Sequence, residues 1–497
     1  MGKAAGLVQR VAGGDEDCAP SCYVGTNSGK RKLSNLEPRI LARAEHPISR
    51  RDIDANVLKV LYRLAGAGYD AYLVGGGVRD LMLSRRPKDF DVATSAHPQQ
   101  VRDLFRNSRM IGRRFRLVHV FFGRQNVEVA TFRKQAEAVA DTDDPLIRLD
   151  NTFGTPEEDA FRRDFTVNAL FYSPQSFNVI DFPGGVDDLE ARLIRTIGDP
   201  ELRMREDPVR MMRAVRFAAK LGFEIEPATR AAIGRHRADL DKASVPRLVD
   251  ETYKTLGQPE AAHALVLMEE LGLLEHVIPI LASHLKSRGA TLAEQPAVRN
   301  MAALGRAIGS GLSPDHSIVL AALMLDLYRD EHRQPTARGG TRGRSGGDNT
   351  GRRIDILGEL RARGFARGDT EQMRLLLEAF ENLAAPTRRT RRLMRRPYFP
   401  DARMFFEMSA PTYSIDATRT MHFLADPDSF TASPTASRVG ADAPAAPDGA
   451  VPPVPKRRRR RRRRRSRHGG AANNGLPSGD LNGVSVSHPS PDPTRRD

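Results

Sequence analysis

Two aspartates one residue apart, Asp89 and Asp91, are the residues whose type and spacing most directly suggest chemistry. In a β-strand, residues i and i+2 point to the same face about 6.5 Å apart, so both carboxylates face one site while Phe90 enters the core. Adjacent carboxylates repel each other, and hard oxygen ligands suit one or two Mg²⁺ ions. Such a metal pair activates an attacking hydroxyl and stabilises a leaving pyrophosphate. The segment predicts a strand that carries a divalent-cation site.

A glycine turn, Gly75-Gly76-Gly77, follows a predicted strand over residues 71–74. Glycine lets the backbone approach a ligand closely because no Cβ intervenes. The helix that follows would present free N–H groups to an anion, and Arg79 in its first turn adds a cation that suits a phosphate. Alone, the pattern equally fits a tight turn in which Asp80 offsets the helix dipole. Beside the aspartate pair, it predicts an anion site.

Two further carboxylates are candidates to complete this site. Glu128 lies in an alternating segment, residues 127–132, that predicts a strand with buried neighbours. Asp164 follows two arginines, Arg162 and Arg163, and precedes the apolar segment 167–170, which predicts the opening of a helix. The alternative for Asp164 is a helix N-cap.

A third group of polar residues lies at the start of a predicted helix. Pro208 marks this start, because proline suits the first turn of a helix. Asp207 and Arg210 are three residues apart, so they can lie side by side and present a coplanar acceptor and donor. Such a pair matches the hydrogen-bonding edge of adenine or cytosine. Arg213 and Arg216 continue the basic strip, whose plainer interpretation is a solvated helix face.

The elements that must position these residues form an α/β pattern that begins near Asp52, where apolar residues recur at helical spacing. From about Leu189 to Leu424 the pattern is mostly helical, with a glycine- and arginine-rich insert over residues 334–353. Residues 1–50 and 426–497 have the composition of disordered segments. The 497 residues are enough for two to four folded units.

Charge and cysteine content exclude several classes of protein. The chain has 78 Lys and Arg against 62 Asp and Glu, a net charge of +16. Eleven of these cations lie in one run, Lys456, Arg457–Arg465 and Arg467, so a uniformly basic, histone-like protein is excluded. Two cysteines, Cys18 and Cys22, cannot form a disulfide framework. The sequence contains no stretch of 18 apolar residues, so it predicts no transmembrane helix. We therefore expect a cytoplasmic protein.

Five motifs in order give the chain a family resemblance: GGGVRD, DFD, EVATFR, RRDFTVNAL and EDPVRMMRAVRF. Together they resemble the class II nucleotidyltransferases, which comprise bacterial poly(A) polymerases and CCA-adding enzymes. The resemblance is dense from Ala71 to Pro227 and thins through the helical part. It implies metal-dependent transfer of a nucleoside monophosphate from a triphosphate to an RNA 3′-hydroxyl, with two Mg²⁺ ions.

The resemblance also implies roles for individual residues. Asp89 and Asp91 would bind the catalytic Mg²⁺, and Asp164 would be the third active-site carboxylate, with Glu128 as a competing candidate. The remaining matched positions would serve the nucleotide: Gly75, Gly76 and Arg79 hold the triphosphate, Arg163 and Asn168 contact ribose or phosphates, Asp207 and Arg210 read the base, and Arg213 and Arg216 support the phosphates or position that pair.

The segment GRRFRLVHV, residues 112–120, resembles the poly(A) polymerase branch more than the CCA-adding branch. This resemblance predicts template-independent addition of AMP from ATP to RNA 3′ ends. A CCA-adding enzyme that uses CTP and ATP is the alternative, and a non-catalytic RNA-binding protein is the alternative from another class. The arginine run would bind polyanions, and an RNA-degradation complex is left open as a partner.

We therefore expect an α+β protein. Its parts are a polymerase-β-like nucleotidyltransferase head with a mixed β-sheet (51–188), a helical neck for base selection (189–257), a helical RNA-binding body (258–425) with a flexible insert (334–353), a disordered leader (1–50) and a disordered arginine-rich tail (426–497).

Overall fold

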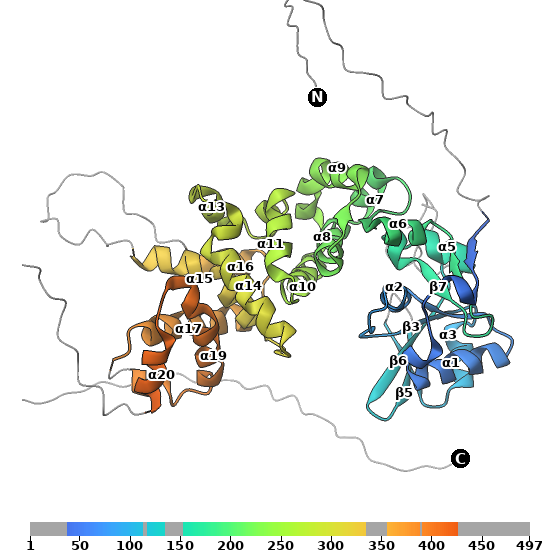
Figure 1. Ribbon diagram of the computed structural model, residues 1–497, viewed down its shortest axis with the longest axis horizontal. Coiled ribbons are helices and arrows are strands. Elements are labelled where there is room, and N and C mark those ends of the chain that lie inside the picture. The colour runs from blue at the N-terminus through green and yellow to red at the C-terminus, as the bar shows by residue number, and fades with distance from the viewer. Residues whose placement is uncertain (1–36, 113–116, 135–152, 334–354, 388–389, 426–497) are drawn as a thin grey trace, which may run out of the picture. The chain divides into compact units, whose positions relative to one another are not determined.

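The structure is a computed structural model that describes residues 37–112, 117–134, 153–333, 355–387 and 390–425 (Figure 1). The first 36 residues, the predicted insert over 334–353 and the arginine-rich tail lie outside these ranges. The same holds for Arg113, Arg114 and Arg116 of the branch-specific segment.

The head is built on a mixed sheet. Within the described residues it has eight strands, in which β3 and β6 are parallel and all other neighbours are antiparallel. In spatial order the strands are β1 (Arg39–Leu41), β8 (Val179–Asp181), β7 (Leu170–Tyr172), β2 (Ala71–Val74), β3 (Asp91–Thr94), β6 (Gln125–Thr131), β5 (Leu117–Phe122) and β4 (Ser108–Ile111).

Apolar side chains cover both faces of this sheet. On one face, Leu73, Val92 and Val129 are buried in the main core, and α1 (Ala55–Gly66) and α3 (Pro98–Leu104) contact the strands of the sheet. Figure 1 shows these two helices beside the sheet. On the other face, Val74, Ala93, Phe132 and Phe171 pack with Ala160 and Phe161 of α5 (Pro156–Phe161). Alternate residues of each strand supply the two faces, which is why the central strands β2 and β7 contain no charged residue.

The predicted disorder of residues 1–50 is wrong from residue 37 onward. β1 pairs with β8 at the edge of the sheet, and two short 3-10 helices follow it, η2 (Arg43–Glu45) and η3 (Arg50–Asp52). Leu41 and Ile48 are buried in the main core. Burial of these two side chains anchors the segment to the head, although its sequence shows no helical or strand period.

Two local predictions in the head also differ from the structure. The strand with the aspartate pair begins at Asp91, so Asp89 lies in the loop before it. Its partner β2 ends at Val74, opposite Asp91, which leaves Asp89 no neighbouring strand on that side. The helix expected over 167–170 is one 3-10 turn, η4 (Thr166–Asn168), and then strand β7, because Leu170–Tyr172 pairs with β2 and β8.

The neck consists of helices and one small strand pair. Strands β9 (Leu193–Ile194) and β10 (Glu224–Ile225) run parallel, so this part is not purely α-helical. The predicted boundary at residue 188 falls inside α6, whose Val186 and Leu189 are buried in the core. The helices are α6 (Gly185–Ala191), α7 (Pro200–Glu206), α8 (Val209–Leu221), α9 (Pro227–His236), η5 (Arg237–Lys242) and α10 (Val245–Leu256), and the head also contains α2 (Gly76–Met82).

The body is helical throughout its described residues. Helices α14, α15, α17 and α19 pack against one another around apolar residues such as Leu323, Leu376 and Phe380. None of the described helices is both long and apolar enough to cross a lipid bilayer. The elements are α11 (Ala261–Glu270), α12 (Leu274–Val277), α13 (Pro279–Ser287), η6 (Leu292–Glu294), α14 (Pro296–Gly309), α15 (His316–Arg333), α16 (Ile356–Ala362), α17 (Arg367–Ala384), α18 (Thr390–Leu393), α19 (Phe399–Ser409), η7 (Ala410–Tyr413) and α20 (Ala417–Ala425).

Candidate active site

One cavity of about 710 Å³ gathers the predicted site residues from four separate segments of the chain. It is lined by the glycine turn, the aspartate pair, the segment after α5 and the first turns of α8. Glu128 does not line it. The predicted residues in its lining are Gly75, Gly76, Arg79, Asp89, Asp91, Arg163, Asp164, Asn168, Asp207, Arg210, Arg213 and Arg216.

The glycine turn forms one wall of the cavity, and two of its glycines are required by their surroundings. Gly75 has a φ of 72°, a left-handed conformation that favours glycine, and a Cβ there would lie 3.2 Å from the Arg163 guanidinium. A Cβ on Gly77 would lie 3.3 Å from the Asp89 carbonyl oxygen. The turn therefore brings α2 against the loop that carries Asp89, and both meet the cavity.

Asp91 is the carboxylate with the least favourable electrostatic surroundings in this group. It is in register with Glu128 on the parallel strand β6, so the two side chains leave the same face of the sheet. Burial, together with the charges of Glu128 and Asp89, raises the pKa of Asp91, although Arg163 opposes the shift. Asp91 nevertheless remains open to the cavity. A cation that entered here would relieve the repulsion.

The family implied by the motifs uses divalent metal ions, and the donor set can be tested against this. Within the described residues, no group of three or more His, Cys, Asp or Glu side chains is arranged to hold a metal ion. Asp89 and Asp91 both line the cavity and both offer hard carboxylate oxygens, and the pKa of Asp91 is raised by burial and then by the negative charges of Glu128 and Asp89. This pair therefore fits a divalent cation in charge and in ligand type.

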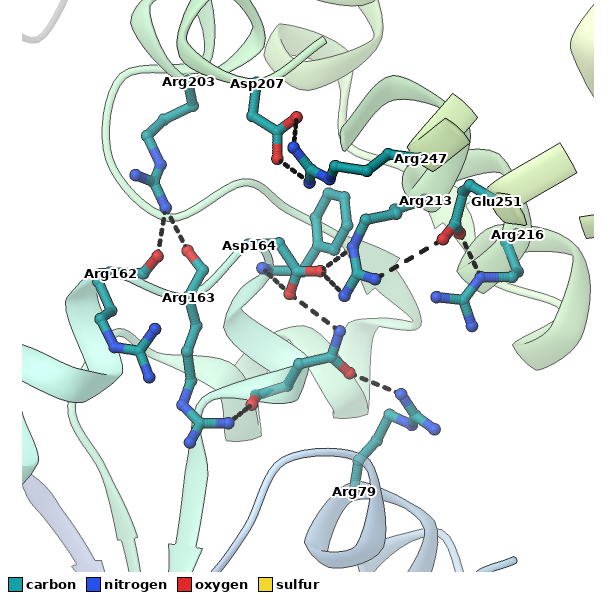
Figure 2. A network of polar contacts seen from close by, with 12 residues as sticks. Arg79, Arg162, Arg163, Asp164, Arg203, Asp207, Arg213, Arg216, Arg247 and Glu251 are labelled. Carbon is teal, nitrogen blue, oxygen red and sulfur yellow. Dashed lines mark hydrogen bonds and ion pairs between the residues drawn. The ribbon is translucent and has the colours of Figure 1, made fainter. Parts of the chain in front are cut away.

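A hydrogen-bond network connects the glycine-turn helix to the rest of the cavity (Figure 2). The guanidinium of Arg79 is buried and donates to Asp80 and, over 2.6 Å, to the side-chain oxygen of Asn168. The Asn168 amide in turn donates to Asp164 over 3.2 Å. Arg163 donates to the backbone oxygen of Asn168. The phosphate-binding candidates are thus held in place by one another.

Asp164 continues this network into the neck. Its Oδ2 accepts from Arg213 of α8 over 2.5 and 2.8 Å, and its Oδ1 accepts from the Phe165 N–H. Burial would raise the pKa of Asp164, but Arg213 and the hydrogen bonds outweigh it and hold the pKa below its usual value. Arg213 and Arg216 both meet Glu251 of α10. Asp164 therefore joins head to neck, whatever further role it has.

Neither candidate for a third carboxylate is free of other contacts. Both oxygens of Asp164 accept hydrogen bonds, whereas the Glu128 side chain is 48% exposed and lies 3.4 Å from the Nε2 atom of His119. Glu128 is beside Asp91 on the sheet but outside the cavity lining. The role of third carboxylate stays a prediction for both residues.

The side-by-side pair predicted for Asp207 and Arg210 is replaced by other partners. Asp207 accepts two hydrogen bonds, of 2.7 and 3.1 Å, from the guanidinium of Arg247 on α10 (Figure 2). Arg210 donates to the Arg203 carbonyl oxygen and to Glu206. Both residues still line the cavity, so reading of a base by them stays a prediction.

The sequence did not predict the residues that hold the predicted site residues in place. Asp159 accepts hydrogen bonds from Arg162 and Arg163, and Arg247 and Glu251 engage Asp207, Arg213 and Arg216. Arg247 is 40 residues from Asp207 along the chain. Ion-pair partners at such separations leave no periodic signal in the sequence, so no pattern could have identified them.

Two family models match the chain, one on the head and one on the neck and early body. The first is described as the poly A polymerase head domain and matches residues 71–195. The second is described as a probable RNA and SrmB-binding site of polymerase A and matches residues 222–285. Both stretches include residues that line the cavity or lie on helices that form it.

Among similar proteins is poly(A) polymerase I of Escherichia coli, 49% identical over 270 residues, which are 53% of this chain and 58% of that protein. The poly(A) polymerase I of Haemophilus influenzae is 39% identical over 303 residues, 59% of this chain and 67% of that protein. A structure of the Bacillus stearothermophilus CCA-adding enzyme in complex with CTP has a TM-score of 0.55 at 27% identity, over 76% of this chain and 84% of that one. The chain thus spans little more than half the length of the first of these relatives.

Proposed function

Because the chain belongs to the class II nucleotidyltransferases, which comprise bacterial poly(A) polymerases and CCA-adding enzymes, we propose that it polyadenylates RNA without a template. In this reaction the RNA 3′-hydroxyl attacks the α-phosphorus of ATP, a new phosphodiester bond forms, and pyrophosphate leaves. The relatives named poly(A) polymerase I favour this activity over CCA addition. ATP and RNA acceptors are both abundant in the cytoplasm, which is where we expect the reaction.

The observation that carries this proposal is the composition of the cavity. Paired carboxylates, a glycine turn and arginines from the head and the neck all meet in it. The carboxylates suit a cation, and the glycine turn and arginines suit a polyphosphate. A site with this charge arrangement can accommodate a nucleoside triphosphate together with its counter-ion.

We assign the binding of Mg²⁺ to Asp89 and Asp91. When bound, Mg²⁺ would polarise the attacking hydroxyl and neutralise charge on the leaving pyrophosphate. The residues of the chain bind and orient the substrates. Arg79 is held by Asn168 so that its charge stays in the cavity, and Gly75 leaves room for a phosphate to approach the backbone.

We assign base selection to Asp207 and Arg210, as the resemblance implies. Adenine offers a donor amine and an acceptor ring nitrogen on one edge, which a carboxylate and a guanidinium can match. The Asp207 carboxylate is held by Arg247, so its orientation is set before the nucleotide enters. Pre-organisation of this kind lowers the entropy cost of recognition.

The test is incorporation by the purified full chain with each of the four nucleoside triphosphates, a short RNA and Mg²⁺. Long tails made from ATP alone support polyadenylation. Addition of one to three residues that requires CTP and ATP would show a CCA-adding enzyme instead. RNA binding without incorporation from any triphosphate would show the non-catalytic alternative.

A further inference from the structure

Three cavities of the head are connected to one another through residues that line two of them. Lys88 lines both the catalytic cavity and a second cavity of about 640 Å³. Arg51 lines this second cavity and a third one of about 500 Å³. The shared residues place the three cavities in succession along a path from the catalytic cavity past η3 to the turn between β7 and β8.

The second cavity is predominantly basic. Its cations are Arg51, Arg85, Arg86 and Lys88, all of them exposed, and none forms an ion pair with any part of the chain that the structure describes. Two acids, Asp52 and Asp54, also line it. Asp54 is engaged as the N-cap of α1, where its Oδ1 accepts from the Asn56 N–H over 2.7 Å. The cavity therefore carries a surplus of uncompensated positive charge.

The third cavity combines cations with aromatic rings. Arg43, Arg50 and Arg51 line it, without an acid among its described residues. Tyr62 is 40% exposed, and the Arg50 guanidinium lies 4.5 Å from the centre of the Phe177 ring. Arginines with accessible rings are the combination that binds single-stranded nucleic acid, because cations neutralise phosphates and rings stack on bases.

Phe177 is held at this cavity in a conformation that its residue type disfavours. Its φ is 60°, in the left-handed region, which a bulky side chain rarely adopts. The His46 ring nitrogen, 2.8 Å from the Phe177 carbonyl oxygen, secures the turn. The surrounding structure thus holds a strained backbone at Phe177, and in this conformation its ring lies beside Arg50.

The hydroxyl of Tyr172 gives a second, independent indication of a ligand. It is buried, it belongs to a residue that lines the third cavity, and it has no hydrogen-bond partner among the described residues. A buried hydroxyl without a partner is costly. A phosphate oxygen entering beside Arg50 would accept a hydrogen bond from it and satisfy it.

We propose that this path, defined by Arg43, Arg50, Arg51, Arg86, Tyr62 and Phe177, binds a stretch of single-stranded RNA outside the catalytic cavity. The inference rests on the proposed function, since it takes RNA to be the substrate. The cations neutralise successive backbone phosphates, and Tyr62 and Phe177 supply stacking surfaces for bases. RNA held here stays on the enzyme between additions, so the path promotes processive extension.

The experiment measures binding of a mixed-sequence RNA of about 20 nucleotides, longer than the ~4–16 nucleotides that one single-strand site covers. The full chain is compared with the double variant Arg51→Gln, Arg86→Gln, without any nucleotide present. Each phosphate that is no longer neutralised lowers the slope of log K against log salt by about 0.7, so the slope for the double variant should be smaller by about 1.4. Arg102→Gln is the matched control, because Arg102 is exposed on α3 and lines none of the three cavities.

A second measurement locates the RNA. The same RNA with 4-thiouridine at internal positions should cross-link to peptides that contain Tyr62 or Phe177, and unlabelled RNA should compete the cross-link away. An unchanged salt slope in the double variant would overturn the proposal, and so would competition by ATP but not by RNA, which would indicate a nucleotide site.

Incorporation separates this inference from the proposed function. The double variant should add the first AMP at the rate of the parent and then release products with shorter tails. If the parent adds no AMP, the proposed function fails, while the binding and cross-linking results still decide whether RNA occupies the path.

Discussion

At the scale of single residues, the Asp91 carboxylate of the cavity acts against folding. The pKa of Asp91 is raised by partial burial of its carboxyl group and by the charges of Glu128 and Asp89. Its ionisation is therefore less favourable in the folded chain than in the unfolded one, and stability falls as the pH rises from the unfolded value through the folded pKa. A bound cation would reverse this penalty, which explains why such a charge cluster is tolerated at a site.

Asp91→Asn should abolish most activity and stabilise the fold. We expect AMP incorporation to fall roughly 10³-fold, because loss of the carboxylate would remove several kcal/mol of transition-state stabilisation by the bound metal ion. Without divalent ions, the melting temperature should rise at pH 7 and rise less at pH 4, because protonation of Asp91 in the parent removes the unfavourable charge as the pH falls. RNA binding should persist. Calorimetry at the two pH values and a primer-extension assay measure these effects.

Asp103→Asn is the matched control, because Asp103 lies exposed on α3, away from the cavity. It should change neither activity nor the pH dependence of the melting temperature. A stabilisation as large as that of Asp91→Asn would assign the effect to net charge and contradict the local explanation.

Arg247 offers a residue-scale test of nucleotide choice. Arg247→Ala removes the two hydrogen bonds that orient Asp207, so the carboxylate gains rotational freedom. We expect the preference for ATP over CTP, measured as a ratio of kcat/KM values, to fall about tenfold, equivalent to about 1.4 kcal/mol. Arg247→Lys should restore it partly, because lysine keeps the charge but not the planar pair of donors. Equal losses for ATP and CTP would assign Arg247 to binding alone.

At the scale of elements, the link between the head and α8 depends on a mostly buried ion pair. Asp164 is 10% exposed and Arg213 is 33% exposed, and they are joined by two hydrogen bonds. Breaking a buried pair by removing one partner leaves an uncompensated charge. The loss should therefore exceed that of an exposed ion pair such as Lys254–Asp250.

Asp164→Ala should destabilise the chain by about 3 kcal/mol, whereas Asp164→Asn combined with Arg213→Gln should cost less than Asp164→Ala alone. The lowered pKa of Asp164 adds a pH dependence. Its contribution is present above the unfolded pKa and is lost as the pH falls through the folded value, so acid should reduce the difference between parent and variant. Urea unfolding between pH 3 and pH 7 measures both effects, and a pH-independent difference would contradict the assignment.

At the scale of the whole molecule, positive charge is distributed very unevenly along the chain. Eleven of the cations that produce the net charge of +16 lie between residues 456 and 467, outside the described residues. The basic residues of the cavity are placed by the fold, whereas we expect the run from 456 to attract RNA through its charge alone. We therefore expect the run to attract RNA of any sequence and the cavity to place the reacting groups.

Truncation after residue 425 should weaken RNA binding and make it less dependent on salt, because fewer phosphates are neutralised. The ratio of ATP to CTP incorporation should not change, since Asp207, Arg210 and Arg247 remain. Filter binding at several salt concentrations and the four-nucleotide incorporation panel measure the two effects. A change in nucleotide preference on truncation would contradict this separation.

Local patterns sufficed for much of the site and the head. The glycine turn, Asp89 and Asp91, and strands β2 and β6 are readable from adjacent residues, because strand alternation and glycine turns depend on neighbours in the chain. The mixed sheet and the helical body also agree with the prediction. The predictions failed where pairing partners decide the structure: at β1, at β7, and at Asp89, which lies before its predicted strand.

The amino-acid sequence by itself thus determined which residues can bind a cation and a phosphate, since that capacity depends on side-chain chemistry and short spacing. Only the tertiary structure decided which of them share a cavity and what holds them there. Asp164 is drawn to Arg213, and Asp207 to Arg247, across 40 or more residues of chain. Electrostatic attraction acts through space, so partners brought together by folding leave no trace in the linear order.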